Sequence, residues 1–331
     1  MKMTRLGKDG PETSQFGIGA MSFAGIYGDA TEEDSHAVLT ACLEAGVSHI
    51  DTANVYGMGR SEDIIGTWLA ANPGARDKFT IATKASITRR DGVRVYDNSL
   101  EHLEAELDKS LERLGTDHVD LFYVHRREAE RPIEEVTEAL AGLVRKGKTR
   151  AFGFSEIAPS SLRRASAVHH VAAVQSEYSL STRSCELGLE QACAELGTTL
   201  VAFSPVGRSY LTDAPFGFER VSTNNFMKAN PRFVQPNYDA NIAITDRFRA
   251  LARDMDISAA GLAIAWLIAK GDHVLPIPGT SSVAHLAELL EGTTRRLTAE
   301  DLARIEEVLP VGWAHGDRYT VDQWVGPERY C

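Results

Sequence analysis

The chain has 331 residues and a mass of 36.1 kDa, with 43% hydrophobic and 24% charged residues. This is the composition of an ordinary globular protein, and it argues against a disordered chain. The 35 Lys and Arg residues are outnumbered by 46 Asp and Glu residues, which gives a net charge of −11. Nucleic acids and anionic membranes are therefore disfavoured as partners, and a phosphate-rich ligand would need the few cations gathered at its site.

The longest uninterrupted apolar run, Leu262–Ala269, is far shorter than the roughly 20 residues that a membrane-spanning helix needs. The first ten residues contain no apolar stretch of signal-peptide length, so we expect cytoplasmic residence. The four cysteines (Cys42, Cys185, Cys193 and Cys331) form no CxxC pair, and no His cluster has metal-ligand spacing. We therefore expect neither a disulfide framework nor a metal site, and we interpret Cys185 and Cys193 as reduced packing residues on one helix.

Short runs of β-branched residues alternate with longer patterns in which apolar residues recur three and four positions apart. The first kind of pattern indicates buried strands and the second indicates amphipathic helices. Glycines follow several of the helical patterns, at the position where helices commonly end. The expected strands are 16–20, 47–51, 79–84, 119–125, 149–155, 172–176, 199–204 and 274–278. The expected helices are 32–45, 61–71, 99–114, 133–146, 160–169, 186–196, 241–255, 258–270 and 283–290.

Eight strands that are each followed by a helix predict parallel β–α–β units, which either close into a barrel or form an open sheet. The strand count and the chain length favour an α/β fold of the (β/α)8 TIM barrel type. No GxGxxG run opens a helix after the first strand, which counts against an open dinucleotide-binding sheet. No repeat, linker or low-complexity tract divides the chain, so we expect residues 1–331 to form a single domain.

Two segments interrupt the alternation. Residues 205–240 are rich in Gly, Pro, Asn and aromatic residues and have no convincing period, which is typical of a functional loop and often of a lid. The tail 311–331 carries four aromatic side chains. Three roles remain open for the tail, which could close the bottom of the barrel, contribute to the functional site or only pack against the core. Its aromatic residues are Trp313, Tyr319, Trp324 and Tyr330.

Reactive side chains stand at the ends of consecutive predicted strands. Active sites of (β/α)8 barrels lie at the carboxyl ends of the strands, and here Asp51, Lys84 and His125 end three of them, with Tyr56 shortly after the first. A buried charge is costly unless it is paired. Asp51 and Lys84 alone could therefore be explained as a buried ion pair with a purely structural role. The set of four instead fits proton transfer, because an ammonium stabilises tyrosinate and Asp51 would hold the ammonium. His125 would orient a carbonyl or share the proton. Tyr56 would donate the proton, and a cofactor would supply the hydride.

Eight motifs follow one another along the chain. They are GIGAM (17–21), HIDTANVYGMGRSEDIIG (49–66), IATK (81–84), LGTDHVDLFYVHR (114–126), KTRAFGFSEI (148–157), VQSEYSLSTR (174–183), LVAFSPVGR (200–208) and LPIPGTSS (275–282). With these motifs the sequence resembles the aldo-keto reductase family over 17–309. The second motif, with the later Lys and His, is the most specific. The FSPVGR run and the long loop after it are similar to the bacterial and fungal branch.

The resemblance implies an oxidoreductase with a (β/α)8 barrel that transfers a hydride between NADP(H), or sometimes NAD(H), and a carbonyl or alcohol substrate. It implies a catalytic tetrad of Asp51, Tyr56 as proton donor, Lys84 and His125. It also implies contacts to the nicotinamide carboxamide, the nicotinamide ring, the pyrophosphate, the adenosine phosphate and the adenine. Ser155 and Gln175 match the carboxamide contacts, and Phe203 matches the contact to the nicotinamide ring. The positions matched to the pyrophosphate are Ser204, Val206 and Arg208. The positions matched to the adenosine phosphate and the adenine together are Gly279, Ser281, Ser282, His285 and Glu288.

Three departures from the family pattern bear on the cofactor. Glu156 replaces an Asn that is common beside the carboxamide-binding Ser, and Leu289 stands where many members have an Asn facing the adenine. Ser281, Ser282 and His285 stand where strict NADPH enzymes usually carry Lys or Arg, the best partners of a 2′-phosphate. Two hydroxyls at the start of a helix can still bind an anion, so we favour NADP(H) and keep NAD(H) as an alternative.

The segment after the first strand indicates where the substrate would bind. We expect an apolar and aromatic pocket, which favours an aldehyde, ketone or dicarbonyl over a highly charged substrate. For Arg126 and Arg127 we favour a solvated pair beside Glu128 and Glu130 over a contact to the substrate or to a loop. The expected pocket residues are Met21, Phe23, Ile26, Tyr27, Val55, Trp313 and part of the long loop.

Two further hypotheses remain open at this point. The same residues could work in the oxidative direction, as in an alcohol or sugar dehydrogenase that uses NAD. A barrel of this family could also act as a cofactor-sensing regulatory subunit that gates a partner, although no partner-binding extension is evident. For the enzyme, we expect a monomer whose partner is a small molecule.

Overall fold

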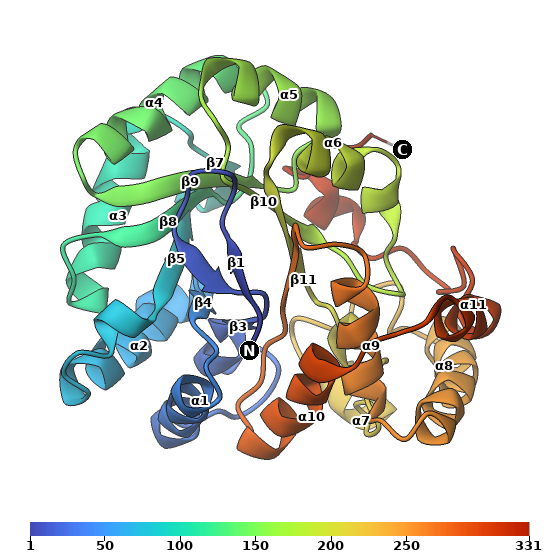
Figure 1. Cartoon of the computed structure of the whole chain (residues 1–331). Helices are drawn as coiled ribbons and strands as arrows, with labels where there is room; N and C mark the ends of the chain where they lie inside the picture. Colours follow the sequence, from blue (N-terminus) through green and yellow to red (C-terminus); the bar gives the residue numbers. More distant parts are fainter. Residues whose placement is uncertain (331) are drawn as a thin grey trace.

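The computed structural model describes residues 1–330 (Figure 1). Eight parallel strands form a nearly closed barrel, in which each strand pairs with its neighbour in the order β12-β11-β10-β9-β8-β5-β4-β3. A hydrogen bond from Gly19 N to Pro278 O (2.8 Å) bridges the seam between the two end strands. The predicted (β/α)8 TIM barrel is confirmed. The strands are β3 (Gly17–Gly19), β4 (His49–Asp51), β5 (Thr80–Ala85), β8 (Val119–Val124), β9 (Thr149–Ser155), β10 (Ala173–Glu177), β11 (Thr199–Phe203) and β12 (Val274–Ile277).

Helices surround the barrel and cover its outer face (Figure 1). Helix α3 shows why the sequence forms them, because its Leu103, Leu107 and Leu111 share one buried face. The Ser99 side chain accepts the His102 backbone N–H at the start of α3, and Gly115 ends the helix with a left-handed backbone. The helices after the strands are α1 (Glu32–Glu44), α2 (Arg60–Ala71), α3 (Leu100–Leu114), α4 (Ile133–Arg145), α5 (Pro159–Val168), α6 (Leu189–Leu196), α8 (Asn237–Asp254), α9 (Ala259–Ile268) and α10 (Val283–Thr294). No helix among residues 1–330 is long and apolar enough to cross a membrane.

The barrel strands have two apolar faces with different partners. Alternate residues such as Leu121, Tyr123 and Val201 form a small core cluster inside the barrel. The residues between them, such as Phe122 and Leu200, belong to the large cluster between the strands and the surrounding helices. Successive side chains of a strand point to opposite faces, so every second residue reaches the barrel interior.

The amino-terminal hairpin closes the bottom of the barrel. Strands β1 (Met3–Arg5) and β2 (Glu12–Ser14) pair antiparallel, and the hairpin, in dark blue in Figure 1, lies across the barrel. Leu6 is completely buried within the cluster inside the barrel, and the Gly7 N–H donates to the Thr199 hydroxyl (2.9 Å). Of the roles considered for the tail, closure of the barrel bottom is therefore wrong.

Several elements differ from the prediction. An additional hairpin of β6 (Ile87–Arg90) and β7 (Val93–Tyr96) follows β5. Cys185 lies in the short 3-10 helix η4 (Ser184–Glu186) and Cys193 in α6, so the expectation that one helix carries both is wrong. These two thiols and Cys42 are free and buried, whereas Cys331 lies outside the described residues. The other additional elements are α7 (Phe218–Thr223) inside the long loop, α11 (Ala299–Val308), and the 3-10 helices η1 (Ala20–Ala24), η2 (Tyr56–Gly59), η3 (Arg76–Lys78), η5 (Gly207–Ser209) and η6 (Val321–Trp324).

Candidate active site

Five of the predicted site residues stand at or just after the carboxyl ends of barrel strands, on the face that points inward. The interior residues Ala82, Tyr123 and Val201 are each two positions before one of them. Because side chains alternate along a strand, this spacing carries all five into the upper end of the barrel interior. The five are Lys84, His125, Ser155, Gln175 and Phe203.

Lys84 is the centre of a group of four polar side chains, Asp51, Tyr56, Lys84 and His125, which we call the polar ring. Its ammonium forms an ion pair with Asp51 and donates to the carbonyl oxygen of Thr52 (2.7 Å) and to the Tyr56 hydroxyl (3.4 Å). The second oxygen of the Asp51 carboxylate accepts from the Gln175 amide (2.8 Å). Burial lowers the pKa of Lys84, but the Asp51 carboxylate and the Tyr56 hydroxyl together outweigh burial and hold this pKa above its ordinary value. Lys84 is therefore a fixed ammonium in contact with the Tyr56 oxygen.

A tight turn after β4 positions Tyr56. The next two residues, Gly57 and Met58, both have positive φ angles (60° and 57°). A Cβ atom at Gly57 would lie 2.9 Å from the Cβ of Ala24, so this position needs glycine for space as well as for conformation. The turn brings Tyr56 back toward the barrel, where the Lys84 ammonium lies 5.1 Å from the centroid of its ring.

His125 follows β8 and faces Tyr56. Its backbone N–H donates to Ala85 O (2.8 Å), and the His125 and Tyr56 rings meet edge to face with centroids 5.9 Å apart. Burial, and next the guanidinium of Arg126, lower the pKa of His125 well below its usual range. The imidazole is therefore neutral at ordinary pH, so it can orient an oxygen by hydrogen bonding without bringing a charge.

A cavity of about 660 Å³ opens above this ring and extends toward the start of α10. Tyr56, His125 and Asp51 line it, whereas Lys84 is completely buried beneath them. The cavity is lined by every residue that the resemblance matches to cofactor contacts. These residues are Ser155, Gln175, Phe203, Ser204, Val206, Arg208, Gly279, Ser281, Ser282, His285 and Glu288.

The two positions matched to the carboxamide already have partners within the chain. The Ser155 hydroxyl accepts from the Arg126 guanidinium (3.0 Å), and the Gln175 amide nitrogen donates to Asp51. Each side chain can still form further hydrogen bonds, because a hydroxyl is both donor and acceptor and an amide also carries an acceptor oxygen. Both can therefore hold a polar ligand group without breaking the ring.

The other end of the cavity is the start of α10. The Ser282 hydroxyl caps this helix by accepting the His285 N–H (3.4 Å), and the Thr280 hydroxyl accepts the Ser282 N–H (3.0 Å). Ser22 holds the segment by donating to Thr280 O (3.0 Å). A Cβ atom at Gly279 would lie 2.9 Å from Gly19 O, so this side of the cavity depends on bare backbone. These hydroxyls and the N–H groups at the helix start suit an anion.

Arg208 belongs to a buried network of charged groups rather than standing free. Its guanidinium donates to Glu177 (2.8 Å), and Arg232 lies 3.6 Å and Arg318 3.7 Å from the same carboxylate. Burial raises the pKa of Glu177, but Arg208, Arg318 and Arg232 outweigh burial and hold this pKa below its ordinary value. The position expected beside a pyrophosphate thus already has an internal counter-ion.

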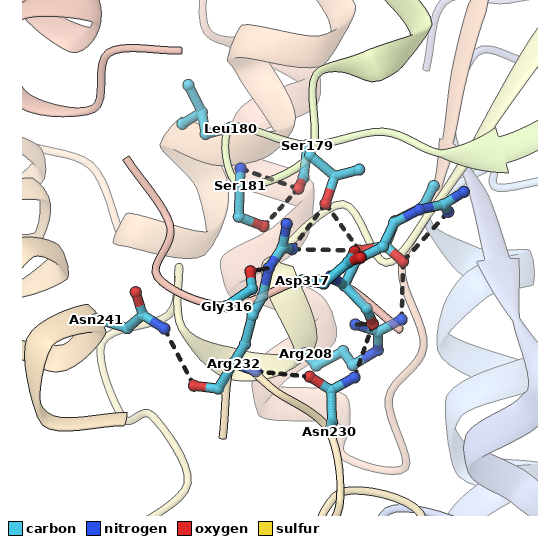
Figure 2. A network of polar contacts seen from close by, with 12 residues as sticks. Ser179, Leu180, Ser181, Arg208, Asn230, Arg232, Asn241, Gly316 and Asp317 are labelled. Carbon is cyan, nitrogen blue, oxygen red and sulfur yellow. Dashed lines mark hydrogen bonds and ion pairs between the residues drawn. The ribbon is translucent and has the colours of Figure 1, made fainter. Parts of the chain in front are cut away.

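Figure 2 shows how this network joins three distant segments. Arg232, from the long loop, donates to Gly316 O in the tail (3.4 Å), and Asn230 donates to Arg318 O (2.8 Å). Arg232 also donates to the hydroxyl of Thr182 (2.7 Å), which follows β10. The long loop, the tail and the end of β10 are therefore held together beside the cavity.

The tail contributes to the site. Tyr319 and Gln323 line the cavity, and Arg318 forms a buried ion pair with Glu156. Glu328 anchors the tail further along by accepting from the Ala158 N–H (2.8 Å). Glu156, which replaces the Asn common in the family, is thus the partner of a tail arginine.

Three expectations about the pocket are wrong. Phe23 is completely buried in the core, and Trp313 is buried with its indole N–H donating to Leu180 O (2.8 Å). Arg126 and Arg127 are not a solvated pair, because Arg126 lines the cavity and Arg127 is buried and paired with Glu328 (3.3 Å). Met21, Ile26, Tyr27 and Val55 do line the cavity.

Sequence reasoning missed the part of the wall that the β6–β7 hairpin supplies. Ile87 and Arg94 of this hairpin line the cavity. The pairing of Arg90 with Val93 leaves a two-residue turn, Asp91-Gly92, in which both φ angles are positive. Asp-Gly between two alternating runs is a strong signal for a hairpin, so the sequence did contain the information. The long loop lines the cavity as expected, through Phe216, Arg220 and Phe226, which no sequence pattern singled out.

A (β/α)8 barrel with an Asp, Lys, Tyr and His ring at its carboxyl end defines a class of proteins. The sequence model of the Aldo/keto reductase family matches residues 15–310. The chain belongs to this family. Within residues 1–330, no group of three or more His, Cys, Asp and Glu side chains is placed to hold a metal ion.

Relatives and solved structures agree with the family. The chain is 37% identical to "Probable aldo-keto reductase 1" of Glycine max, over 95% of this chain and 91% of that protein. It is 36% identical to "Aldo-keto reductase yakc [NADP(+)]" of Schizosaccharomyces pombe, over 92% and 90%. The structure is similar to the glycerol dehydrogenase AKR11B4 of Gluconobacter oxydans (TM-score 0.80, 25% identity, coverage 93% and 94%). It is also similar to the thermostable aldo-keto reductase Tm1743 (TM-score 0.72, 27% identity, coverage 93% and 100%).

Proposed function

We propose that the protein is an NADP(H)-dependent oxidoreductase that reduces an aldehyde or ketone, with Tyr56 as the proton donor. The observation that carries this proposal is the contact between the buried Lys84 ammonium and the Tyr56 hydroxyl (3.4 Å), at the floor of a cavity long enough to reach α10. The bound nicotinamide would supply the hydride. The NADP(+) in the name of the S. pombe relative supports the choice of cofactor.

Each residue of the ring has a distinct task in this proposal. Asp51 keeps the Lys84 ammonium charged and in place, since a buried ammonium without a counter-ion would lose its proton. The ammonium favours the tyrosinate that forms when Tyr56 gives its proton to the carbonyl oxygen. Neutral His125, beside the Tyr56 ring, orients that oxygen. In the oxidative direction the same tyrosine would act as the base.

The Tyr56→Phe variant tests the mechanism. It removes the hydroxyl that donates the proton and retains the aromatic ring of the side chain. We therefore expect kcat to fall by roughly 10²–10⁴-fold, the range typical of general acid catalysis. The dissociation constant of NADPH, measured by fluorescence titration, should change less than about twofold. Tyr178→Phe is the matched control, because this buried tyrosine bonds Glu186 (2.8 Å) and does not line the cavity. Wild-type turnover by Tyr56→Phe would contradict the role of Tyr56.

Cofactor choice is tested separately, because α10 begins with hydroxyls instead of cations. We expect NADPH to bind more tightly than NADH in titrations of the apo protein, and a lower dissociation constant for NADH would reverse this choice. Introducing a cation with Ser281→Arg should raise the preference for NADPH over NADH, since a guanidinium pairs well with a 2′-phosphate.

Other parts of the proposal rest on single observations. A core cluster with members from Phe16 to Trp313 supports one domain. The free thiols of Cys42, Cys185 and Cys193 are compatible with cytoplasmic residence. The FSPVGR run at 203–208 supports the bacterial and fungal branch. We propose a monomer, which light scattering coupled to size exclusion would test.

A further inference from the structure

The catalytic end of the cavity carries two guanidinium groups that no carboxylate neutralises. Arg126 and Arg94 both line the cavity, and among residues 1–330 neither has a carboxylate oxygen within 4.0 Å. Arg126 directly follows His125 and bonds its carbonyl oxygen, and Arg94 lines the same cavity as His125. The carboxylate at this end, that of Asp51, is already neutralised by Lys84.

Arg126 is held in a fixed orientation. One of its terminal nitrogens, Nη1, donates to His125 O (2.7 Å) and to the Ser155 hydroxyl (3.0 Å). Its Nε and Nη2 have no hydrogen-bond acceptor in the part of the chain that the structure describes, and the side chain is half-buried. A cation that has lost part of its hydration without gaining a counter-ion is unfavourable, and an anionic ligand would restore the balance.

Arg94 is an exposed residue of β7 and has no carboxylate partner among the described residues. It lies directly opposite Arg89 in the register of β6 and β7, and like charges at opposed positions destabilise a strand pair. Its guanidinium lies 5.5 Å from the centroid of the Tyr96 ring, beside the cavity. Arg94 is therefore an unpaired cation at the rim of the cavity, where its charge is available to an anionic ligand.

Three further acidic residues line the cavity. Asp213 accepts the Ala259 N–H at the start of α9 (2.8 Å), and Glu288 is part of α10. Asp29 follows Gly28, which lies against the guanidinium of Arg220 from the long loop. Arg126 and Arg94 thus line the cavity as cations without a carboxylate partner, although the whole chain has a net charge of −11.

We propose that the substrate of this enzyme carries an anionic group, a carboxylate or a phosphate, close to its carbonyl, and that Arg126 binds this group with help from Arg94. This inference rests on the proposed reductase function and names its substrate class. It replaces the sequence-based expectation that a highly charged substrate is disfavoured. A guanidinium offers two parallel N–H groups to either kind of anion.

Matched substrate pairs test the proposal on the full-length protein with NADPH. We expect kcat/KM to be at least about tenfold higher for succinic semialdehyde than for butanal, or for glyceraldehyde 3-phosphate than for glyceraldehyde. The first pair reports a carboxylate substrate and the second a phosphate substrate. Values within twofold in both pairs would overturn the proposal.

Variants then separate substrate binding from other effects. Arg126→Met should raise KM for the preferred anionic substrate by about tenfold or more, and Arg94→Gln by severalfold, with little change for the neutral analogue. Arg126→Lys should recover part of the loss. Arg89→Gln is the matched control, because Arg89 is exposed on the same hairpin and does not line the cavity. Equal losses for both members of a pair, or a raised NADPH dissociation constant that explains the loss, would overturn the role of Arg126.

A separate binding experiment distinguishes failure of the proposed reductase function from failure of the anion site. If no carbonyl compound oxidises NADPH, binding of benzoate and benzamide is measured by calorimetry, with and without NADP⁺. Tighter binding of benzoate that depends on Arg126 would support the anion site while the reductase proposal fails. Equal binding of benzoate and benzamide would overturn the anion site as well.

Discussion

Lys84 is completely buried and charged, and the chain accommodates it through a ring of specific contacts. Its partners are one carboxylate oxygen of Asp51, Thr52 O and the Tyr56 hydroxyl. Removing one partner of a buried ion pair leaves an uncompensated charge, whereas replacing both partners by neutral groups is often tolerated. Stability and catalysis should therefore respond differently to single and double substitutions.

The Lys84→Met variant should lose both stability and activity. Asp51 would keep its buried carboxylate without a counter-ion, so we expect the free energy of unfolding to fall by about 3–5 kcal/mol. The double variant Asp51→Asn, Lys84→Met should recover most of this stability and none of the turnover. Urea denaturation and steady-state kinetics measure the two effects. A double variant as unstable as the single one would contradict the ion-pair explanation.

At the scale of elements, the tail is held by side chains that lie far from it in the sequence. Glu156, directly after β9, pairs with Arg318 (Oε1 to Nη1, 3.1 Å), and this pair places Tyr319 and Gln323 at the cavity. Glu328 forms a second attachment to Arg127 and to the Ala158 N–H. The tail should therefore open locally when the first attachment is weakened.

The Glu156→Gln variant tests this attachment. Arg318 would lose its buried partner and keep the more distant Glu177 (3.7 Å), so we expect trypsin to cleave after Arg318 about tenfold faster. Mass spectrometry of a limited digest identifies the site. Glu306→Gln, which loosens a more exposed pair with Arg183, should leave the cleavage rate unchanged. Cleavage at the wild-type rate in Glu156→Gln would show that the tail is held by other contacts.

At the scale of the whole molecule, a buried histidine inside the barrel makes the stability of the fold depend on pH. His49 is completely buried, and neither ring nitrogen has a hydrogen-bond partner among the described residues. Burial, and next the Lys84 ammonium, lower the pKa of His49 to about 3. In the unfolded chain a histidine takes up a proton near pH 6.5. Between these values the unfolded state binds more protons, so stability falls as pH falls.

The His49→Met variant should flatten this acid dependence. At pH 5 the histidine contribution amounts to about 2 kcal/mol, because pH 5 lies about 1.5 units below the unfolded pKa. We therefore expect the loss of unfolding free energy between pH 7.5 and pH 5 to be about 2 kcal/mol smaller in the variant. The remaining loss includes His125, whose pKa is lowered in the same direction. The exposed His315, changed to Gln, is the control. Equal pH slopes in wild type and His49→Met would contradict the assignment.

Most of the barrel was predictable because its signals are local. Strand alternation, helical spacing and helix-ending glycines act over a few residues, and they give the eight strands to within one or two residues at each end. The β6–β7 hairpin and α11 were missed although their signals are present, namely Asp91-Gly92 and the capping box of Thr298 with Asp301. Both signals are local, so the sequence does encode these two elements.

By itself, the sequence determined the barrel and the ring of Asp51, Tyr56, Lys84 and His125, because strand ends and residue parity fix where such side chains lie. Only the tertiary structure decided which distant segments meet. It placed the amino-terminal hairpin under the barrel, tied the tail to Glu156, paired Arg208 with Glu177 and left Arg126 without a counter-ion. Such contacts depend on the shape and charge of surfaces that assemble across the chain, and no local period encodes them.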